Sequence, residues 1–363
     1  MNMIPIAKPQ LEEAEIEAVN NVLRSGIIAE GPRVAEFEQE FADYTGTEYA
    51  VAVNSGTAAL HAALLAHGIG KGDEVITSSF SFIATANSIL FTGAKPVFAD
   101  IRADTFNLAP QLIEEKITAS TKAIMPVHLY GHPADMEAMR DIAEDNDLIL
   151  IEDACQAHGA IYNGKKVGSF GTGAFSFYPT KNMTTSEGGI ITTNSKEIAD
   201  RARMIRAHGS RQRYLHEMLG YNLRMTDISA AIGMVQLKRL PSYIKARQRN
   251  AKLLTDKLQG IEGIECPAVR NGCQHVFHQY TIRTRNRDQL SDYLKEKGIG
   301  SGIYYPIPIH KQPYYKELGY KDNLLVTEKA SREVLSLPVH PAVTENDINT
   351  ITNAIKLWSD EKC

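Results

Sequence analysis

A single lysine lies in the segment from Phe175 to Gly189, FSFYPTKNMTTSEGG. The neighbours of Lys181 are apolar, hydroxyl-bearing and glycine residues, and no acidic residue stands directly beside it. This composition predicts burial in a pocket, where an amine loses hydration and its pKa falls. Such an amine is a candidate covalent catalyst. The alternatives are an ammonium group that reaches back to water, or one that pairs with a distant carboxylate.

Two further segments carry residue types that complement a reactive amine. In LILIEDACQAHG (148–159), Asp153 stands at the carboxyl end of an apolar strand, where α/β sheets bind ligands. A buried carboxylate there needs a cationic partner, although Asp153 could instead cap the residues that follow. The second segment, NSGTAAL (54–60), follows a strand and opens a helix. Its small residues let backbone N–H groups approach a phosphate, but Ser-Gly-Thr is also an ordinary helix cap.

These three segments together fit one cofactor, pyridoxal 5'-phosphate. This cofactor needs an amine that holds it as a Schiff base, an anion that keeps its pyridine nitrogen protonated, and donors for its phosphate. Lys181, Asp153 and the NSGTA turn supply the three groups in that order. The residue types therefore predict a pyridoxal phosphate site.

Four other motifs do not hold. The segment 159–166, GAIYNGKK, has Lys166 where a P-loop carries Ser or Thr, and 68–73, GIGKGD, lacks the third glycine of a dinucleotide fingerprint. The HLYGH segment (128–132) lacks the acid of a zinc-binding HExxH motif, so no metal site is expected. The histidines of HVFH (275–278) are interpreted as surface or packing residues.

Short apolar runs rich in valine and isoleucine alternate with helical patterns between residues 49 and 154. This alternation is typical of βαβ units and a mostly parallel sheet, and hence of the α/β class. Helices are expected over 11–26, 34–46, 84–91, 109–117 and 133–146 and after residue 54, and strands over 49–53, 74–79, 95–101, 122–130, 148–154, 173–178 and 188–194.

A second, smaller α+β domain is predicted in the last hundred residues. A long helical stretch over about 226–258 precedes it, and Pro241 is expected to break that helix. The later segments are a strand at 277–284 and helices at 287–298, 326–335 and 344–357. We therefore expect a large cofactor-binding domain over 1–250, including the N-terminal helix, and a small domain over 251–363.

Bulk composition excludes several classes of protein. The 363 residues include 39 basic and 43 acidic side chains, so no charge excess indicates nucleic acid or an anionic membrane as a partner. The N-terminal residues lack the apolar stretch of a signal peptide, and no run is long enough to span a membrane. Four cysteines without CxxC spacing favour a reducing, cytoplasmic environment.

The chain resembles the sugar aminotransferases of the DegT/DnrJ/StrS family, which have the aspartate-aminotransferase-like fold (fold type I). The resemblance covers essentially the whole chain. It is carried by SGIIAEGPRVAEFE (25–38), NSGTAAL, TSSFSFIATANSI (77–89), IEDACQAHGA, FSFYPTKNMTTSEGG, RAHGS (206–210), YNLRMTDISAAIG (221–233) and YYPIPIHKQPYY (304–315). One departure is Ser186, where many relatives have glycine, and this leaves the conformation of the cofactor loop open.

The resemblance implies a role for individual residues. Lys181 holds the cofactor and moves a proton, Asp153 pairs with the pyridinium nitrogen, Gln156 approaches the phenolic oxygen and Phe82 stacks on the ring. The phosphate is held by Gly56, Thr57 and Ser176, and by Asn222 of a second subunit, which implies a homodimer with shared sites. Arg224, Tyr304 and Tyr305 map to the substrate mouth.

The resemblance also implies the reaction. An amino donor, L-glutamate in this family, gives its amino group to the keto group of a nucleotide-linked sugar. The YYPIPIHKQP segment (304–313) favours amination at C3, with C4 as the alternative. Some relatives of this kind act on a 3-keto uronate, so the carboxylate of such a sugar could meet Arg224; a neutral 3-keto 6-deoxyhexose is the other option, and Arg224 could instead brace the dimer.

Two other functions compete with this one. The dehydratase branch of the family has histidine in place of the Schiff-base lysine, and Lys181 argues against it. A non-catalytic regulatory or sensor protein could keep the fold, but it would be expected to lose Lys181 or Asp153, and both are present.

Overall fold

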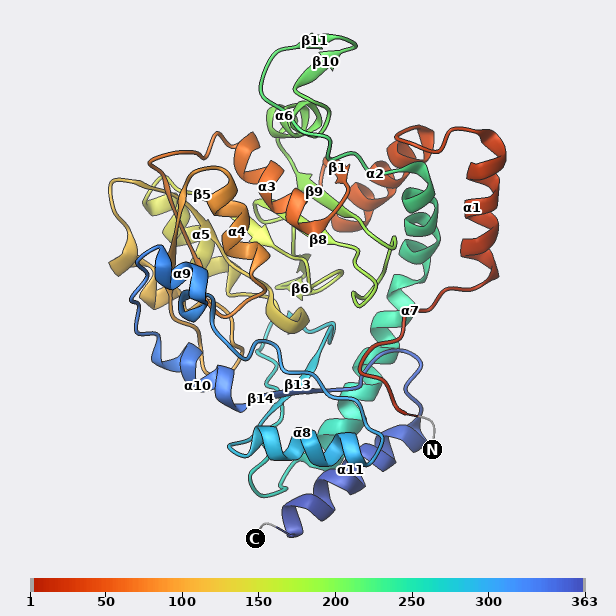
Figure 1. Cartoon of the computed structure of the whole chain (residues 1–363), viewed down its shortest axis with the longest axis vertical. Helices are drawn as coiled ribbons and strands as arrows, with labels where there is room; N and C mark the ends of the chain where they lie inside the picture. The colour runs from red at the N-terminus through yellow and green to blue at the C-terminus, as the bar shows by residue number, and fades with distance from the viewer. Residues whose placement is uncertain (1–2, 362–363) are drawn as a thin grey trace.

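The computed structural model describes residues 3–361, and in it a large α/β domain packs beside a smaller α+β domain (Figure 1). The predicted fold class is confirmed, because a large, mostly parallel sheet alternates with helices along the chain. The strands of the large sheet are β1 (Tyr49–Val53), β2 (Glu74–Ser78), β3 (Lys95–Ala99), β4 (Thr121–Met125), β5 (Ile149–Asp153), β8 (Thr172–Ser176) and β9 (Gly189–Thr193).

The strand order of the sheet is β1-β9-β8-β5-β4-β2-β3. Strand β9 runs antiparallel to β1 and β8, and the other neighbouring pairs are parallel. In the parallel register, Asp153 of β5 pairs with Ala174 of β8, two residues before Ser176. The ends of these two strands therefore lie at one edge of the sheet, where α/β proteins bind ligands.

Two N-terminal helices end at the glycines where the sequence predicts their ends. Helix α1 (Glu13–Ser25) stops at Gly26 and α2 (Pro32–Thr45) stops at Gly46, with φ values of 75° and 80°. Glycine adopts this left-handed conformation without a steric cost, which is why it commonly ends helices. The other helices of the large domain are α3 (Gly56–Ala66), α4 (Ala84–Phe91), α5 (Met136–Asp145) and α6 (Lys196–Arg206).

The helix predicted over 109–117 is wrong. This stretch forms two short 3-10 turns, η1 (Pro110–Leu112) and η2 (Glu114–Lys116). The buried residues of this stretch are Ala109, Pro110 and Ile113, and the last two lie three residues apart. That spacing puts both on one side of a three-residue turn, and it does not require the wider apolar face of an α-helix.

Helix α7 (Asp227–Leu258) is a single helix of 32 residues that runs from the large domain into the small one (Figure 1). The break predicted at Pro241 is therefore wrong. Proline removes one backbone N–H, but the helix is packed on both sides of it. Leu240 and Ile244 belong to a core shared with α2, and Leu254 belongs to the core of the small domain. The packing of these side chains outweighs the tendency of Pro241 to interrupt a helix.

The small domain is built on a two-stranded antiparallel sheet, β13 (Tyr280–Arg283) with β14 (Val334–Leu337). The segment around Ile4 also belongs to it, because the Ile4 N–H donates to the Gly298 carbonyl at 2.9 Å and the Gly300 N–H donates to the Ile4 carbonyl at 2.8 Å. We propose a domain boundary inside α7 near residue 250, with the Ile4 segment assigned to the small domain. Helices α8 (Arg287–Glu296) and α11 (Glu345–Asp360) pack in its core, whereas α9 (Pro313–Glu317) and α10 (Leu325–Glu333) pack against apolar residues of the large domain.

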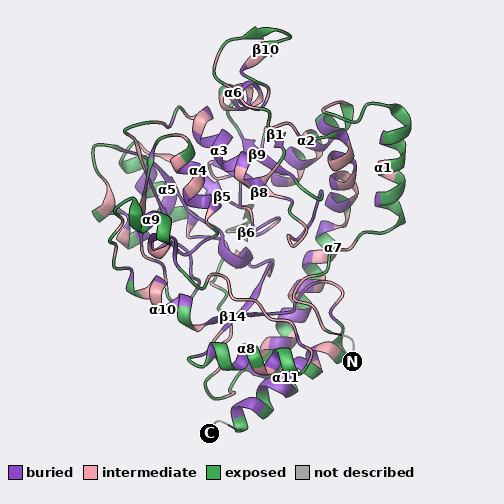
Figure 2. Ribbon diagram, viewed as in Figure 1, coloured by how far each residue is buried: buried purple, intermediate pink, exposed green. Residues whose placement is uncertain are grey.

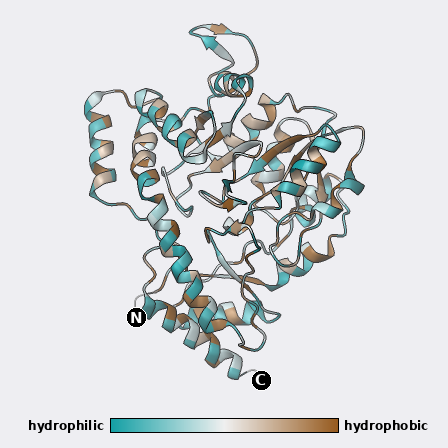
Figure 3. Cartoon of the chain, turned by 180° about the vertical axis from the view of Figure 1, so that it is seen from behind, coloured by the Kyte–Doolittle hydropathy of each residue, from teal (hydrophilic) through white to brown (hydrophobic). Residues whose placement is uncertain are grey.

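The core of the large domain lies along the central strands and α3, which Figure 2 shows as buried. Figure 3 shows the same interior as apolar and the outer turns of many surrounding helices as hydrophilic. Within residues 3–361, no helix is both long enough and apolar enough to cross a membrane.

Ser186 adopts a backbone conformation that favours glycine. Its φ is 72°, in the left-handed region that costs a non-glycine residue about 1–2 kcal/mol. Two neighbouring hydroxyls hold the loop: Thr184 Oγ1 accepts from the Ser186 N–H at 3.0 Å, and Thr185 Oγ1 donates to the Glu187 carbonyl at 2.8 Å. The glycine-type turn is therefore kept although the glycine is absent.

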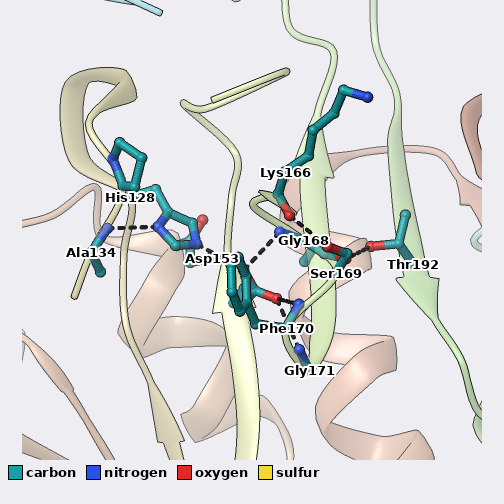
Figure 4. A network of polar contacts seen from close by, with 12 residues as sticks. His128, Ala134, Asp153, Lys166, Gly168, Ser169, Phe170, Gly171 and Thr192 are labelled. Atoms are coloured by element: carbon teal, nitrogen blue, oxygen red, sulfur yellow. Dashed lines mark hydrogen bonds and ion pairs between the residues drawn. The ribbon is translucent and has the colours of Figure 1, made fainter. Parts of the chain in front are cut away.

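A buried network behind β5 holds the end of this strand (Figure 4). Side chains alternate along a strand, so Glu152 points to the opposite face from Asp153. The fully buried Glu152 carboxylate accepts N–H groups from Gly168 at 2.7 Å, Phe170 at 2.7 Å and Gly171 at 3.0 Å.

His128 completes this network with a defined tautomer. Its Nδ1 accepts the Ala134 N–H at 2.9 Å, so Nε2 carries the proton and donates it to Glu152 over 3.1 Å. The carboxylate thus joins β5 to the loop before β8 and to the chain after β4. His128 is a structural partner here and not a metal ligand.

We predict that Glu152→Gln destabilises the protein by about 3 kcal/mol. The amide of glutamine has one acceptor oxygen instead of two, so some of the backbone N–H groups that the carboxylate binds would lose their acceptor. Urea titration of the cofactor-free protein measures this change. The matched control is Glu144→Gln, whose side chain is 71% exposed and whose effect should stay within about 0.5 kcal/mol. Equal midpoints for the two variants would contradict a structural role for Glu152.

Candidate active site

A cavity of about 410 Å³ lies at the sheet edge where β5 and β8 end. All of the predicted site residues except Asn222 and Arg224 line it. Those that do are Gly56, Thr57, Phe82, Asp153, Gln156, Ser176, Lys181, Tyr304 and Tyr305.

One end of the cavity is built to receive an anion. Ser55 caps α3, its Oγ accepting the Ala58 N–H at 3.1 Å, so the first turn of the helix presents its backbone N–H groups. Gly56 lies directly against Ser176: a Cβ on residue 56 would come within 2.5 Å of the Ser176 Cβ. Only glycine allows this approach, which places a serine hydroxyl beside a helix N-terminus. The arrangement suits a phosphate group.

Asp153 lies at the other side of the cavity and is 4% exposed. Its Oδ2 accepts the Thr85 hydroxyl at 2.7 Å, and its Oδ1 accepts the Cys155 N–H at 3.2 Å. No helix begins directly after Asp153 in the part of the chain that the structure describes, so it is not a helix cap. Its bond to the Cys155 N–H is nevertheless a local contact of the kind that the alternative interpretation expected. A carboxylate has room for about four hydrogen bonds, so acceptor capacity remains for a cationic group in the cavity.

Lys181 follows β8 in the loop that leads to β9. Its backbone N–H donates to the Tyr178 carbonyl at 2.8 Å. Burial lowers the pKa of its amine, while the nearby Cys155 and Asp153 act to raise it. Lys181 is half-buried, and within residues 3–361 its Nζ forms no hydrogen bond or ion pair, although it lies near enough to Asp153 to be attracted by it. The predicted burial of this side chain is therefore only partial.

Gln156 links the cofactor side of the cavity to the small-domain side. Its Oε1 accepts the Tyr130 N–H at 2.9 Å, and its Nε2 donates to the Tyr305 hydroxyl at 3.2 Å. Tyr130 in turn donates its hydroxyl to the Tyr304 carbonyl. The Phe82 ring lies 6.1 Å from the Tyr305 ring and is 54% exposed, so one aromatic face remains open to a ligand.

Asn222 and Arg224 do not line the cavity of their own chain. Asn222 is exposed, and Arg224 Nε lies 3.8 Å from a Glu30 carboxylate oxygen. Arg224 is also bridged through its backbone to Val53. The predicted roles of both residues therefore require a second subunit.

The sequence interpretation missed His278 and was correct for its neighbour. His275 is a packing residue, stacked on Phe277 at 3.9 Å between ring centroids. His278 instead lines the cavity, with its Nδ1 buried and without a hydrogen-bond partner among the described residues. Burial lowers its pKa well below the usual value, and the charge of Lys181 acts in the same direction, so the imidazole is neutral. Other lining residues that were not predicted are Ser81, Thr85, Cys155 and Gln279.

The motifs rejected from the sequence form other structures. Residues 159–166 contain a two-stranded hairpin of β6 (Ile161–Tyr162) and β7 (Lys165–Lys166), with no helix of the P-loop type. Over residues 3–361, no cluster of three or more His, Cys, Asp or Glu side chains could hold a metal ion.

The cavity fits pyridoxal phosphate at each of its functional groups. The Gly56–Ser176 contact and the α3 N-terminus form the phosphate pocket, and the open Phe82 face suits the ring. Asp153 keeps acceptor capacity for a protonated ring nitrogen, and the Lys181 amine has no competing partner.

Comparisons with known proteins agree with this geometry. A family model described as the DegT/DnrJ/EryC1/StrS aminotransferase family matches residues 9–356. The chain is 45% identical over 351 residues to the "Pleiotropic regulatory protein" of Geobacillus stearothermophilus, covering 95% of this chain and 94% of that protein. It is 41% identical over 359 residues to the dTDP-3-amino-3,4,6-trideoxy-alpha-D-glucose transaminase of Streptomyces venezuelae, covering 97% and 95%.

A solved structure shows the same fold. The crystal structure of S. venezuelae DesV in complex with a ketimine intermediate superposes with a TM-score of 0.96 at 39% identity, covering 99% of both chains. Aminotransferases of this family use pyridoxal phosphate, the cofactor that the cavity fits. The chain belongs to the DegT/DnrJ/EryC1/StrS aminotransferase family and is a pyridoxal-phosphate-dependent sugar aminotransferase.

Proposed function

We propose that this protein transfers an amino group from L-glutamate to the C3 keto group of a nucleotide-linked sugar. The observation that carries the proposal is the amine of Lys181, which has no hydrogen-bond or ion-pair partner among the described residues and lines the same cavity as the Asp153 carboxylate. A regulatory protein would have no need to keep a partly dehydrated amine that no hydrogen bond or ion pair holds, since such an amine costs free energy.

Lys181 is the covalent anchor of the cofactor and the group that moves the proton. Because burial lowers its pKa, a larger fraction of the amine is uncharged near neutral pH than for an exposed lysine. The uncharged Nζ would accept a proton from the substrate carbon that carries the nitrogen and, as an ammonium group, would donate it to the bound cofactor within the same half-reaction. In the other half-reaction the proton would move in the opposite direction.

The other lining residues bind and orient the cofactor. Asp153 holds the ring nitrogen protonated through its charge, Gln156 meets the phenolic oxygen, and Phe82 covers one ring face. When bound, pyridoxal phosphate supplies an electron-withdrawing ring that stabilises negative charge on the substrate carbon. The phosphate lies between the α3 N-terminus, with Gly56 and Thr57, and the Ser176 hydroxyl.

Tyr304 and Tyr305 form the wall that meets the sugar. They line the cavity across from Phe82 and supply ring faces and hydroxyl groups, which suit a hexose. Burial raises the pKa of both tyrosines, so their hydroxyls remain protonated and can donate. A transaminase whose name specifies a 3-amino sugar is 41% identical to this chain, which supports C3 as the site of amination.

A homodimer with shared sites completes the proposal. An apolar surface is open on α1 and the loop after it, formed by Leu11, Ile16, Leu23, Ile27 and Ile28, each at least half exposed. A hairpin of β10 (Ser210–Gln212) and β11 (Leu215–His216) extends away from the large domain (Figure 1) and leads to the exposed Asn222. We propose that Asn222 reaches the phosphate, and Arg224 the sugar, of the neighbouring subunit.

The competing function is regulatory. A relative with 45% identity carries the name "Pleiotropic regulatory protein", which keeps this function as the alternative.

We propose a cytoplasmic enzyme, since the three described cysteines are free thiols, as expected in a reducing compartment.

We predict that Lys181→Ala abolishes the absorbance band of the covalently held cofactor and lowers the transamination rate by a factor of at least about 10³. Absorbance spectra and amine formation from glutamate measure the two effects. The control is Lys196→Ala, whose ammonium is 73% exposed and pairs with Asp200, and it should behave as wild type. Full turnover by Lys181→Ala, or a wild-type protein that remains colourless with added cofactor, would favour the regulatory alternative.

Mixing two inactive variants tests the shared site. Lys181→Ala and Asn222→Ala, mixed in equal amounts under conditions of subunit exchange, should recover about a quarter of wild-type activity, because about half of the dimers are hybrids with one intact site each. If Asn222 acts within its own subunit, every site in the mixture carries a defect. No recovery after mass spectrometry has confirmed subunit exchange would therefore contradict the shared site.

The regiochemistry is tested by NMR of the product formed from ¹⁵N-glutamate and matched 3-keto and 4-keto nucleotide sugars. We expect nitrogen on C3. With a uronate substrate, Arg224→Gln should raise KM about tenfold, because a charge-assisted bidentate contact to the C6 carboxylate is lost. The neutral 6-deoxy sugar is the matched control. Nitrogen on C4 would overturn the C3 assignment, and equal KM changes for both sugars would leave Arg224 as a dimer brace.

A further inference from the structure

The Asp153 carboxylate receives one hydrogen bond from the chain on each oxygen. The backbone N–H of Cys155 reaches Oδ1 at 3.2 Å, and the hydroxyl of Thr85 reaches Oδ2 at 2.7 Å. The first donor is two residues away on the same chain segment, whereas Thr85 comes from α4, on another part of the domain. Thr85 is therefore the donor that can set the position of the carboxylate relative to the rest of the cavity.

The hydroxyl groups that lead to Asp153 have a defined direction. A carboxylate only accepts hydrogen bonds, so the single proton of the Thr85 hydroxyl points to Asp153. Ser81 Oγ lies 2.7 Å from Thr85 Oγ1, and because the Thr85 proton is already used, Ser81 must be the donor in that pair. The chain thus runs from Ser81 to Thr85 to Asp153. Successive donors of this kind polarise one another and strengthen the last bond.

Helix capping does not explain these two hydroxyls. Serine and threonine near a helix start commonly accept a backbone N–H, yet α4 begins without a side-chain cap. Both residues are nearly fully buried, with exposures of 4% for Ser81 and 1% for Thr85, and both line the cavity. Phe82 lies between them on the same turn, where the Thr85 N–H donates to its carbonyl at 3.1 Å.

We propose that Thr85, polarised by Ser81, is a positioning residue that directs the Asp153 carboxylate at the ring nitrogen of the cofactor. The Thr85 hydroxyl fixes where the carboxylate oxygen lies, so the charge of Asp153 faces the ring nitrogen with which it pairs. Phe82 lies just before α4, and its carbonyl accepts the Thr85 N–H at 3.1 Å, so the start of this helix also sets the ring face against the carboxylate. This inference rests on the proposed role of Asp153.

The test is a double-mutant cycle on the affinity for pyridoxal phosphate, measured by equilibrium dialysis. Thr85→Val keeps the shape of the side chain and removes its donor, and it should weaken binding about tenfold. In an Asp153→Asn background the same substitution should change the affinity by less than about twofold, since the charged acceptor is gone. Thr85→Ser restores the donor and should recover most of the affinity.

The matched control is Thr77→Val, a fully buried threonine on β2 whose hydroxyl donates to the Met125 carbonyl at 2.7 Å. This variant also loses a buried threonine hydroxyl, but that hydroxyl is not bonded to Asp153, so the cofactor affinity should be unchanged. If Thr85→Val lowers the yield of folded protein, Ser81→Ala is a second variant that disturbs the same series of hydroxyl hydrogen bonds. Its expected effect is smaller than that of Thr85→Val, because it removes only the polarising donor.

A cofactor analogue separates positioning from packing. In 1-deazapyridoxal phosphate a carbon replaces the ring nitrogen, so Asp153 has no proton to hold. Thr85→Val should then bind the analogue as wild type does. Equal losses for cofactor and analogue, or equal losses in both backgrounds of the cycle, would reduce Thr85 to a packing residue and overturn the proposal. A wild-type protein that prefers neither ligand would instead refute the role of Asp153 itself.

Discussion

Two buried carboxylates occupy neighbouring positions at the end of β5, and the active site depends on their being satisfied in different ways. Alternation along the strand turns Glu152 away from the cavity and Asp153 into it. Glu152 is satisfied within the chain, by three backbone N–H groups and His128. Asp153 receives two donors and keeps capacity for a cation. One carboxylate therefore fixes the strand end, and the other is available for chemistry.

The cavity is assembled from segments with separate tasks. The large domain supplies the groups that face the cofactor, while Tyr304 and Tyr305 arrive from the segment before α9. Gln156 joins the two sides through Tyr130 and Tyr305. Under the proposed assignment, a change of sugar would be met in the segment of Tyr304 and Tyr305, and the cofactor contacts would stay in place. This separation is consistent with a family whose members share a fold and a cofactor while acting on different sugars.

Local signals in the sequence predicted the parts of the structure that depend on local physics. Gly26 ends its helix because glycine adopts a left-handed backbone conformation without steric cost. Asp153 and Lys181 stand out because a charged group in apolar surroundings costs free energy unless it has a partner or a function. Long-range contacts decided the rest. Helix α7 continues through Pro241 because two separate cores pack on it, and His278 enters the cavity because its segment pairs with residues near 131. No local pattern encodes either contact.

The pairing of Ile4 with Gly298 and Gly300 has a consequence for the order in which the chain folds during synthesis. The large domain lies between these two segments in sequence, so its sheet can form while the ribosome is still translating the small domain. Ile4 leaves the ribosome long before its hydrogen-bond partners Gly298 and Gly300. The apolar side chain of Ile4 therefore stays unprotected until the segment that contains these two glycines has been made. Chaperones that bind short apolar stretches would be expected to act at this point of biogenesis.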